Sequence, residues 1–499
     1  MITSFGEYLP DLPELENPGA TVALNVVPRT AKSYGPFNDL AVVSDALAAR
    51  CQGMFSAVDD SGNVYTFAGD AGALYKADSN LTWSDVSDTT TSSTYVTATD
   101  DYWKFVQYGN RVIATNFFND VQTFVVGTDS QFTDLDSANA PKARHIAIIR
   151  NWVFLGNTND GVDGNVPHRV WWSGFDDPTS WPTVGGAAAA AAQSDYQDLP
   201  GYGWCQGLVG AVGGTDGAAF MENGIFRITY EGPPTVFRFD HLEGARGTPA
   251  PGSITQVGAL VYYLGEDGFY VFDGSNSIPI GAQKVDRTFF DDADQTLFHR
   301  ISSTADPVKP LIFWSYVSQS SADGEPDKIL IYNWEIRRWS LVEKSHQIIG
   351  RSIGFGYTLE GLDVFGNMDT LPYSLDSRYW AGGAVNLSAF DTSNKLGNFN
   401  GDALEATLET GEFSGDDRRL FITGVRPLVD GGTVTAAIGT RDAPDGTRNW
   451  SSLTPPAADG VCPQRQSARY VKARVSIAAA GMWEHAQGIE PRVRLEGRR

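Results

Sequence analysis

Cysteine, long apolar runs and positive charge are all scarce in this chain of 499 residues. The three cysteines, Cys51, Cys205 and Cys462, lie far apart and form no C-x-x-C pair. This pattern argues against a disulfide framework and fits a reducing compartment. No apolar run approaches the roughly 20 residues of a membrane-spanning helix, and the first residues lack the basic and apolar regions of a secretory signal. We therefore expect a protein made in the cytoplasm that has no membrane-spanning segment.

Acidic residues outnumber basic residues, with 60 Asp and Glu against 37 Lys and Arg, so the formal net charge is −23. An acidic surface repels DNA phosphate at long range and does not suggest a protein that reads DNA sequence. Basic residues nevertheless gather at the end of the chain, where Arg492 and Arg494 stand two residues apart. They either belong to the solvated faces of terminal strands or form a docking surface for an acidic partner or a neighbouring copy.

Catalytic and metal-binding motifs are missing as well. The six histidines fall in no recognisable motif, and the sequence has no G-x-S-x-G around Ser173, no H-E-x-x-H and no Walker A pattern. The acidic pair Asp176-Asp177 and the acidic stretch 291–294 match no calcium-binding loop, and Asx turns or helix N-caps explain them better. We therefore predict no enzymatic activity, no cofactor and no metal.

Glycine and aromatic residues are abundant, with 53 Gly and 12% aromatics. Short apolar runs alternate with turn signals, most clearly around Asn223-Gly224 and Asp267-Gly268. Both dipeptides favour the type I′ turn of a two-residue β-hairpin. They lie 44 residues apart, which suits one four-stranded propeller blade of ~40–50 residues. Similar meanders recur from about residue 52, so we expect six or seven irregular blades.

The sequence predicts an all-β protein in three parts: an extended N-terminal arm over 1–45, a β-propeller over 46–370 and a β-sandwich over 371–499. The last boundary follows a loss of aromatic residues near Leu371. The arm either packs on its own or a neighbouring subunit or supplies a strand that closes the propeller. Only 45–50 and 187–193 favour short helices, and the second is equally typical of a loop. One or two long sandwiches would also give this alternation, but the recurring strand, turn, strand and tryptophan pattern favours a propeller.

Several segments, in this order along the chain, resemble the tail nozzle proteins of short-tailed bacteriophages, also called packaged-DNA stabilisation or head-closure proteins. They are ALNVVPRTAKSYGPF, FAGDAGALYKAD, WKFVQYGNRVIATN, RVWWSGFDDPTSW, YYLGEDGFYVFDG followed by IPIG and VDRTFF, and YNWEIRRWSLVE. The resemblance covers about residues 20–345 and is weak after about residue 375.

This resemblance implies a structural virion protein without enzymatic activity. It implies a homo-oligomeric ring, commonly of six copies, that extends the DNA channel below the portal and its adaptor. Such a ring retains packaged DNA and conducts double-stranded DNA during ejection without sequence-specific binding. The implied partners are the portal-adaptor protein of the phage neck and the tail needle, spike or fibre proteins. The implied location is the virion tail, after assembly in the host cytoplasm.

In such a ring, some acidic side chains must face the channel or the outside, and the contacts between copies must overcome mutual repulsion. We expect two acidic loops to line the channel because each follows a bulky aromatic strand that would anchor a projecting loop: Asp176 and Asp177, and Asp291, Asp292 and Asp294. Interface centres favour aromatic and arginine side chains. The candidate contacts are therefore Trp171, Trp172 and Trp380, expected in exposed loops, together with Arg492 and Arg494.

A glycan-binding or glycan-hydrolysing propeller of the sialidase type is the main alternative. Residues 78–83, DSNLTW, match the Asp-box pattern S-x-D-x-G-x-T-W in part but lack its glycine, and 177–181 match less well. Such an enzyme also needs an arginine cluster and a tyrosine nucleophile with a glutamate partner. No motif places those residues here. Another β-rich virion protein or secreted binding protein also remains open.

Overall fold

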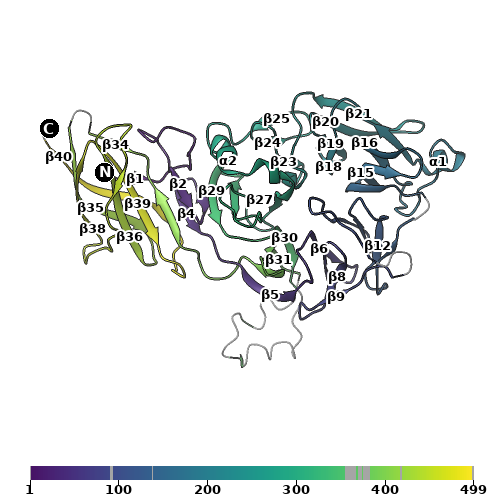
Figure 1. The fold of residues 1–499 in the computed structure, drawn as a ribbon, viewed down its shortest axis with the longest axis horizontal. Coiled ribbons are helices and arrows are strands. Elements are labelled where there is room, and N and C mark those ends of the chain that lie inside the picture. The colour runs from purple at the N-terminus through teal and green to yellow at the C-terminus, as the bar shows by residue number, and fades with distance from the viewer. Residues whose placement is uncertain are drawn as a thin grey trace.

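The computed structural model describes residues 2–89, 94–136, 139–354, 367–368, 374, 383–415 and 418–496. Its main body is a ring of seven four-stranded antiparallel blades, which confirms the predicted propeller (Figure 1). Six blades are separate four-stranded sheets, and blade 6 is the first part of a ten-stranded sheet.

The strands of blades 1 to 4 follow one another along the chain. Blade 1 contains β6 (Gly53–Val58), β7 (Val64–Gly69), β8 (Leu74–Ala77) and β9 (Trp83–Asp85), and blade 2 contains β10 (Lys104–Tyr108), β11 (Arg111–Thr115), β12 (Gln122–Val125) and β13 (Thr133–Asp134). Blade 3 contains β14 (Lys142–Ile149), β15 (Trp152–Asp160), β16 (Gly164–Trp172) and β17 (Asp195–Asp198). Blade 4 contains β18 (Cys205–Val212), β19 (Asp216–Met221), β20 (Ile225–Gly232) and β21 (Val236–Glu243).

Blades 5 to 7 complete the ring. Blade 5 contains β22 (Thr255–Val257), β23 (Leu260–Leu264), β24 (Phe269–Phe272) and β25 (Ser277–Pro279). Blade 6 contains β26 (Ser302–Ala305), β27 (Leu311–Tyr316), β28 (Lys328–Asn333) and β29 (Arg338–Glu343). Blade 7 contains β30 (Ile348–Ile353), β31 (Val385–Phe390), β32 (Lys395–Asn398) and β5 (Ala41–Ala46). Within the described residues, four short helical elements lie beside the blades: α1 (Ala187–Ala192), η1 (Pro251–Ser253), α2 (Asp286–Asp292) and η2 (Gln295–Arg300).

A strand from the N-terminal region closes the ring. β5 pairs antiparallel with β32, so blade 7 joins two parts of the chain about 350 residues apart. The strands of the ring therefore run from Ala41 to Asn398, beyond the predicted limits of 46 and 370. The predicted helix over 45–50 is absent, because its first residues belong to β5. The limit at 370 itself lies outside the described residues.

Glycines allow neighbouring blades to approach closely. A Cβ atom added to Gly210 would lie 1.9 Å from the carbonyl oxygen of Ile148 in the preceding blade. One added to Gly252 would lie 1.8 Å from the carbonyl oxygen of Ile301. No other residue fits such positions unless the backbone shifts.

Both predicted hairpins are present, but their turns differ from the prediction. The closing pairs are Phe220 with Ile225 and Leu264 with Phe269. Beyond these pairs, the backbone nitrogen of Met221 donates to Gly224 O and that of Gly265 donates to Gly268 O, so the central residues of the turns are 222–223 and 266–267, one position earlier than predicted. Neither Asn223 nor Asp267 has a positive φ.

The N-terminal segment belongs to the folded body of its own chain. Its strands are β1 (Thr3–Ser4), β2 (Val22–Leu24), β3 (Val26–Thr30) and β4 (Ser33–Pro36). β2 pairs with β29 of blade 6 on one side and with β33 (Ala406–Glu409) on the other. This strand makes one ten-stranded sheet of blade 6 and part of the C-terminal region. The arm thus packs on its own subunit, and the following strand, β5, closes the ring.

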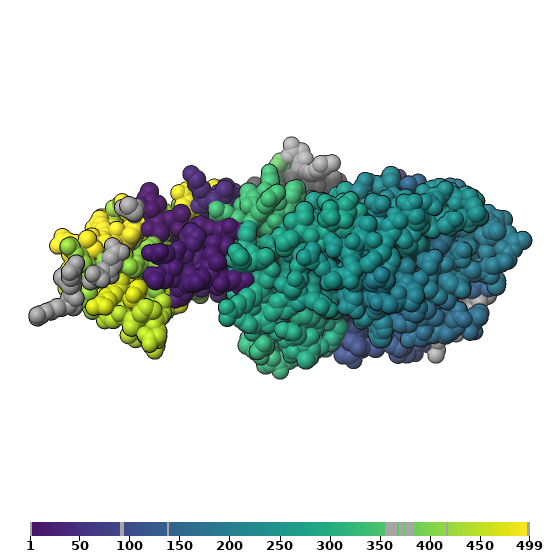
Figure 2. All heavy atoms as spheres, turned by 90° about the horizontal axis from the view of Figure 1, so that it is seen from above, coloured from purple at the N-terminus to yellow at the C-terminus, as the bar shows by residue number. Residues whose placement is uncertain are grey.

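The C-terminal region forms two sheets on either side of a shared hydrophobic core. Its remaining strands are β34 (Phe413–Ser414), β35 (Leu420–Val429), β36 (Val434–Arg441), β37 (Asn449–Trp450), β38 (Cys462–Ala468), β39 (Tyr470–Ile477) and β40 (Ala486–Leu495). Ile422 and Ile489 enter the core from the six-stranded sheet, and Ile438 and Val475 enter it from the other sheet. Figure 2 shows an elongated molecule with the C-terminal region at one end and the propeller at the other.

Candidate functional site

Two predicted interface tryptophans are core residues, so their prediction as exposed loop residues is wrong. Trp171 and Trp172 lie in β16 and are 8% and 2% exposed. Neighbours in a strand point to opposite faces, so Trp171 packs toward blade 2 while Trp172 packs toward Phe237 of blade 4. Trp380 lies outside the described residues.

The first predicted acidic loop is an exposed turn that follows β16. The hydroxyl of Tyr108, in blade 2, donates a hydrogen bond to Asp176 Oδ1 at 2.7 Å. Asp177 Oδ1 accepts from the backbone nitrogen of Thr179 at 3.0 Å. Burial and the neighbouring Asp176 carboxylate raise the pKa of Tyr108 to about 12, so this phenol remains a donor at neutral pH. Both carboxylates remain exposed at the rim of blade 3.

The second predicted acidic loop is helical, so the prediction of a projecting loop is wrong. Asp291 and Asp292 end helix α2. Asp292 accepts from the ammonium group of Lys328 at 2.8 Å and from the hydroxyl of Tyr316 at 2.9 Å. Asp294 caps η2 by accepting from the backbone nitrogen of Thr296. Asp291 alone projects into solvent, with 73% of its side chain exposed.

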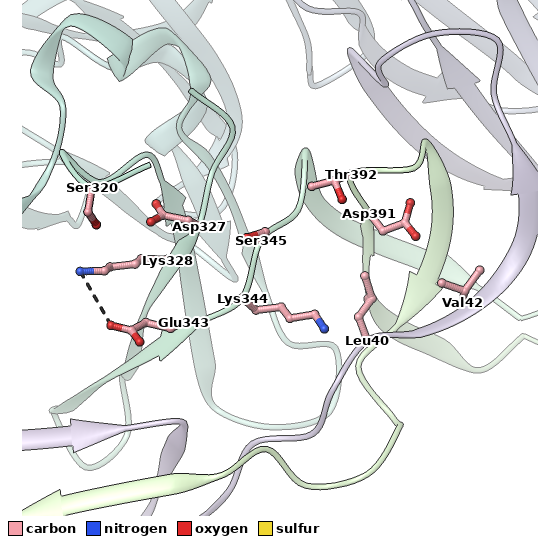
Figure 3. A pocket seen from close by; sticks show the side chains of 10 residues that line it. All are labelled: Leu40, Val42, Ser320, Asp327, Lys328, Glu343, Lys344, Ser345, Asp391 and Thr392. Carbon is pink, nitrogen blue, oxygen red and sulfur yellow. Dashed lines mark ion pairs between the residues drawn. The ribbon is translucent and has the colours of Figure 1, made fainter. Parts of the chain in front are cut away.

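A groove between blades 6 and 7 is the candidate site that the structure adds. We call it the blade 6–7 groove (Figure 3). It has a volume of about 680 Å³ and ten lining residues: Leu40, Val42, Ser320, Asp327, Lys328, Glu343, Lys344, Ser345, Asp391 and Thr392. These come from the start of β5 and the residue before it, the loop between β27 and β28 with the start of β28, the end of β29 with the residues after it, and the turn between β31 and β32. Sequence reasoning missed the groove because its three walls lie up to 350 residues apart.

The charges of this groove are predominantly acidic. Three lining carboxylates, Asp327, Glu343 and Asp391, are joined by two that pair with its lysines, Asp39 and Asp292. The ammonium group of Lys328 lies 3.9 Å from Glu343 (Figure 3), and Lys344 pairs with Asp39 outside the lining. The lining residues alone carry three carboxylates and two lysines, a net charge of −1, and both lysines are paired with the carboxylates of Asp292 and Asp39 beside the groove. The groove therefore suits a cationic group and disfavours phosphate.

Glu343 and Asp391 hold the free acceptor capacity of the groove. The side chain of Glu343 is 52% exposed, and its contact with Lys328 is long. Asp391 Oδ1 accepts from the backbone nitrogens of Ser393 and Lys395, each at 2.8 Å. No bond to Asp391 Oδ2 occurs within the described part of the chain. Each carboxylate can therefore accept a guanidinium.

The basic residues near the end of the chain divide into two groups. Lys472 pairs with Glu14 at 2.9 Å and with Glu409 at 2.7 Å, and only 4% of its side chain is exposed. Arg492 and Arg494 instead lie exposed on β40. Arg492 pairs with Asp459 at 3.0 Å, with about half of each side chain exposed, so this pair contributes little. Arg492 and Arg494 thus lie on the solvated part of a terminal strand, as the first prediction from the sequence has it, whereas Lys472 belongs to an internal ion-pair cluster that neither prediction included.

An arginine–glutamate cluster lies where the first strands of blades 1 and 6 begin. Glu325 accepts from Arg50 at 3.0 Å and from Arg300 at 2.8 Å. Arg50 also donates to the hydroxyl of Tyr102 at 3.0 Å. Burial raises the pKa of Tyr102 even though Arg50 lies beside it. The phenol therefore stays protonated at neutral pH, which is unfavourable for a tyrosine nucleophile.

The part of the chain that the structure describes holds no candidate metal centre and no helix that could span a membrane. There, no group of three or more His, Cys, Asp or Glu side chains is placed to hold a metal ion. Cys51, Cys205 and Cys462 are free thiols in buried positions. In the same part of the chain, no helix is long and apolar enough to cross a membrane.

Comparisons with known proteins give distant structural likenesses. No family model and no curated protein matches the chain. A streptogramin B lyase structure is 11% identical, with a TM-score of 0.39, over 72% of this chain and 97% of the other. Virginiamycin B lyase from Staphylococcus aureus is 10% identical, with a TM-score of 0.39, over 72% and 99%. The computationally designed Ika8 protein is 10% identical, with a TM-score of 0.37, also over 72% and 99%. Likenesses this distant assign neither activity nor partner.

Proposed function

We propose that this chain is a structural subunit of the tail nozzle of a short-tailed bacteriophage. Copies of it, six in our proposal, form a ring that extends the DNA channel below the portal and its adaptor. The ring retains packaged DNA, conducts it during ejection and binds the tail needle, spike or fibre proteins. The observation that carries the proposal is the ordered series of segments between about residues 20 and 345 that resembles nozzle proteins.

The positions of these segments support a role in architecture. WKFVQYGNRVIATN forms the β10–β11 hairpin, YYLGEDGFYVFDG the β23–β24 hairpin, and YNWEIRRWSLVE the end of β28 and the whole of β29. ALNVVPRTAKSYGPF contains the end of β2, which connects blade 6 to the C-terminal sheets, and the whole of β3 and β4. The resemblance therefore falls on blade hairpins and on the connection between the two ends of the molecule.

The acidic surface supports passage of DNA without binding. Proteins hold DNA by placing Lys and Arg on phosphates and releasing counterions. A lumen formed by subunits with a net charge of −23 offers few such contacts. DNA would then slide through it without being held.

We also propose that the protein catalyses no reaction. In a sialidase-like alternative, Tyr102 would be the nucleophile and Glu325 its partner, beside Arg50 and Arg300. Tyr102 is held as a neutral phenol, and Glu325 lies between the guanidinium groups of Arg50 and Arg300. This arrangement favours a structural ion-pair cluster.

The proposal is tested by the mass and shape of the pure protein. Negative-stain images and mass photometry over a range of concentrations are expected to show closed rings of about six copies with a central hole. A protein that stays monomeric at every concentration contradicts the proposal. So does hydrolysis of a sialoside or a polysaccharide that a single Asp or Glu substitution abolishes.

A further inference from the structure

The end of β40 and the blade 6–7 groove are complementary in charge. Arg492 and Arg494 lie two residues apart, so both point to the same face of the strand, roughly 7 Å apart. Val493 between them points to the opposite face, and Arg492 pairs at 3.0 Å with Asp459, an exposed pair that contributes little. The groove presents Glu343 and Asp391 on either side of Lys344 (Figure 3). A strand with two exposed arginines and a groove with more carboxylates than lysines thus occur on the same chain.

We propose that Arg492 and Arg494 of one copy bind in the blade 6–7 groove of a second copy. Glu343 and Asp391 accept the two guanidinium groups, since arginine forms bidentate pairs with carboxylates. Leu40 and Val42 contact the aliphatic stems of the arginines, and Val42 is 48% exposed in the single chain. This contact deepens the proposed nozzle function, because it assigns the surfaces that join neighbouring copies.

The scarcity of exposed positive charge favours a second copy as the occupant. Most of this surface is acidic, so two copies repel each other unless a basic segment mediates their contact. Lys472 cannot serve, because it is buried in pairs with Glu14 and Glu409. The end of β40 is exposed, and Leu495 beside the arginines is 60% exposed.

The two surfaces lie in different parts of the molecule, which suits a ring. β40 belongs to the C-terminal end, whereas β29 and β5, which border the groove, lie toward the propeller (Figure 1). A contact between two different patches is head-to-tail and leaves one free patch of each kind on every pair. Further copies can therefore be added until the ring closes.

The test is a charge-reversal cycle measured by mass photometry and analytical ultracentrifugation. The first variant carries Arg492→Glu and Arg494→Glu, the second carries Glu343→Arg and Asp391→Arg, and the third combines all four changes. We expect each double variant to weaken association about 100-fold, because it places like charges against each other in the contact. The combined variant should recover association to within about tenfold of the natural chain.

Matched controls separate the contact from net charge and folding. Lys32→Glu with Lys309→Glu makes the same charge change as the first variant at two exposed positions, and it should leave association unchanged. Circular dichroism should be the same for all variants, whereas the melting midpoint should be unchanged for the arginine reversals and lower for the variants with Asp391→Arg, which lose the two backbone bonds of that turn.

Three results would overturn the contact. If the natural chain forms rings and both double variants do too, the contact is wrong although the nozzle proposal stands. If the arginine reversals abolish rings and the combined variant does not restore them, β40 binds a surface other than the groove. If the natural chain never associates, the contact and the nozzle proposal both fail.

Discussion

At the residue scale, one buried carboxyl group makes the stability of the propeller depend on pH. Asp286, at the start of α2, packs against Gly268 and Gly281 and is 8% exposed. Its Oδ1 atom accepts from the backbone nitrogen of Phe269 at 3.1 Å. Burial is the main cause that raises its pKa to about 7, and the nearby Asp11 and Asp267 raise it further. The ordinary value for Asp is near 3.9 in an unfolded chain.

The raised pKa predicts that Asp286→Asn stabilises the protein at alkaline pH. Between about pH 4 and pH 7 the folded state binds more protons than the unfolded state, so stability falls as the pH rises through this window. The asparagine cannot ionise, and its oxygen can still accept from Phe269. Thermal melting should show a higher midpoint for the variant than for the natural chain at pH 9, where the free energy of unfolding rises by up to about 4 kcal/mol. At pH 4 the two midpoints should differ little.

The matched control is Asp291→Asn, in the same helix, whose side chain is exposed. It should change the midpoint little at either pH. Equal midpoints for Asp286→Asn and the natural chain at pH 9 would show that Asp286 ionises in the fold without cost.

At the element scale, the short strand β2 holds the two ends of the molecule together. It has three residues, yet it pairs with β29 through Leu24 and with β33 through all three. Glu14, earlier in the same segment, joins Lys472 and Arg448 by ion pairs at 2.9 Å and 2.6 Å. These partners lower the pKa of Glu14, so its charge persists below the usual range of a glutamate.

This position predicts that Ala23→Pro loosens the connection while the propeller remains folded. Proline removes a backbone donor and is excluded from central strands, at a cost of about 3 kcal/mol or more. Limited proteolysis should cut the variant between the propeller and the C-terminal sheets faster than it cuts the natural chain. Small-angle scattering should show a broader distribution of distances, with unchanged strand content by circular dichroism.

Ala31→Pro is the matched control, because it lies in the exposed turn between β3 and β4 of the same segment. It should behave like the natural chain in both measurements. If Ala23→Pro behaves like this control, the connection does not depend on β2.

At the scale of the whole molecule, the acidic surface predicts how the ring treats DNA. Of the five candidate channel residues, Asp292 and Asp294 hold the local structure, which leaves Asp176, Asp177 and Asp291 exposed. Replacing these three with lysine should leave rings intact and slow genome release, because lysines in the lumen would bind phosphate. The effect should be greatest at low salt, where release of counterions favours binding most.

The measurement is the rate of DNA ejection from assembled particles at two salt concentrations. Lysines at Glu266, Glu335 and Asp445 give the same charge change at three other exposed positions. An unchanged ejection rate at low salt would show that Asp176, Asp177 and Asp291 do not face the channel. Equal slowing by the control would show that net charge, and not position, sets the rate.

The sequence alone determined the fold class and its repeat, because strand periodicity and turn residues are local signals. It located the β19–β20 and β23–β24 hairpins and indicated six or seven blades. It could not give the turn type or the limits of the ring, because β5 finds its partner β32 about 350 residues away. Pairing at such a distance leaves no local pattern in the chain.

Only the tertiary structure decided which side chains are available for contact. Trp171 and Trp172 read as loop residues in the sequence, yet each packs between two blades. Asp292 read as part of a free acidic loop, yet Lys328 and Tyr316 bind it from other strands. The blade 6–7 groove exists only where three distant segments meet. Burial and ion pairing depend on neighbours in space, and the ring closure that brings those neighbours together is a property of the whole chain.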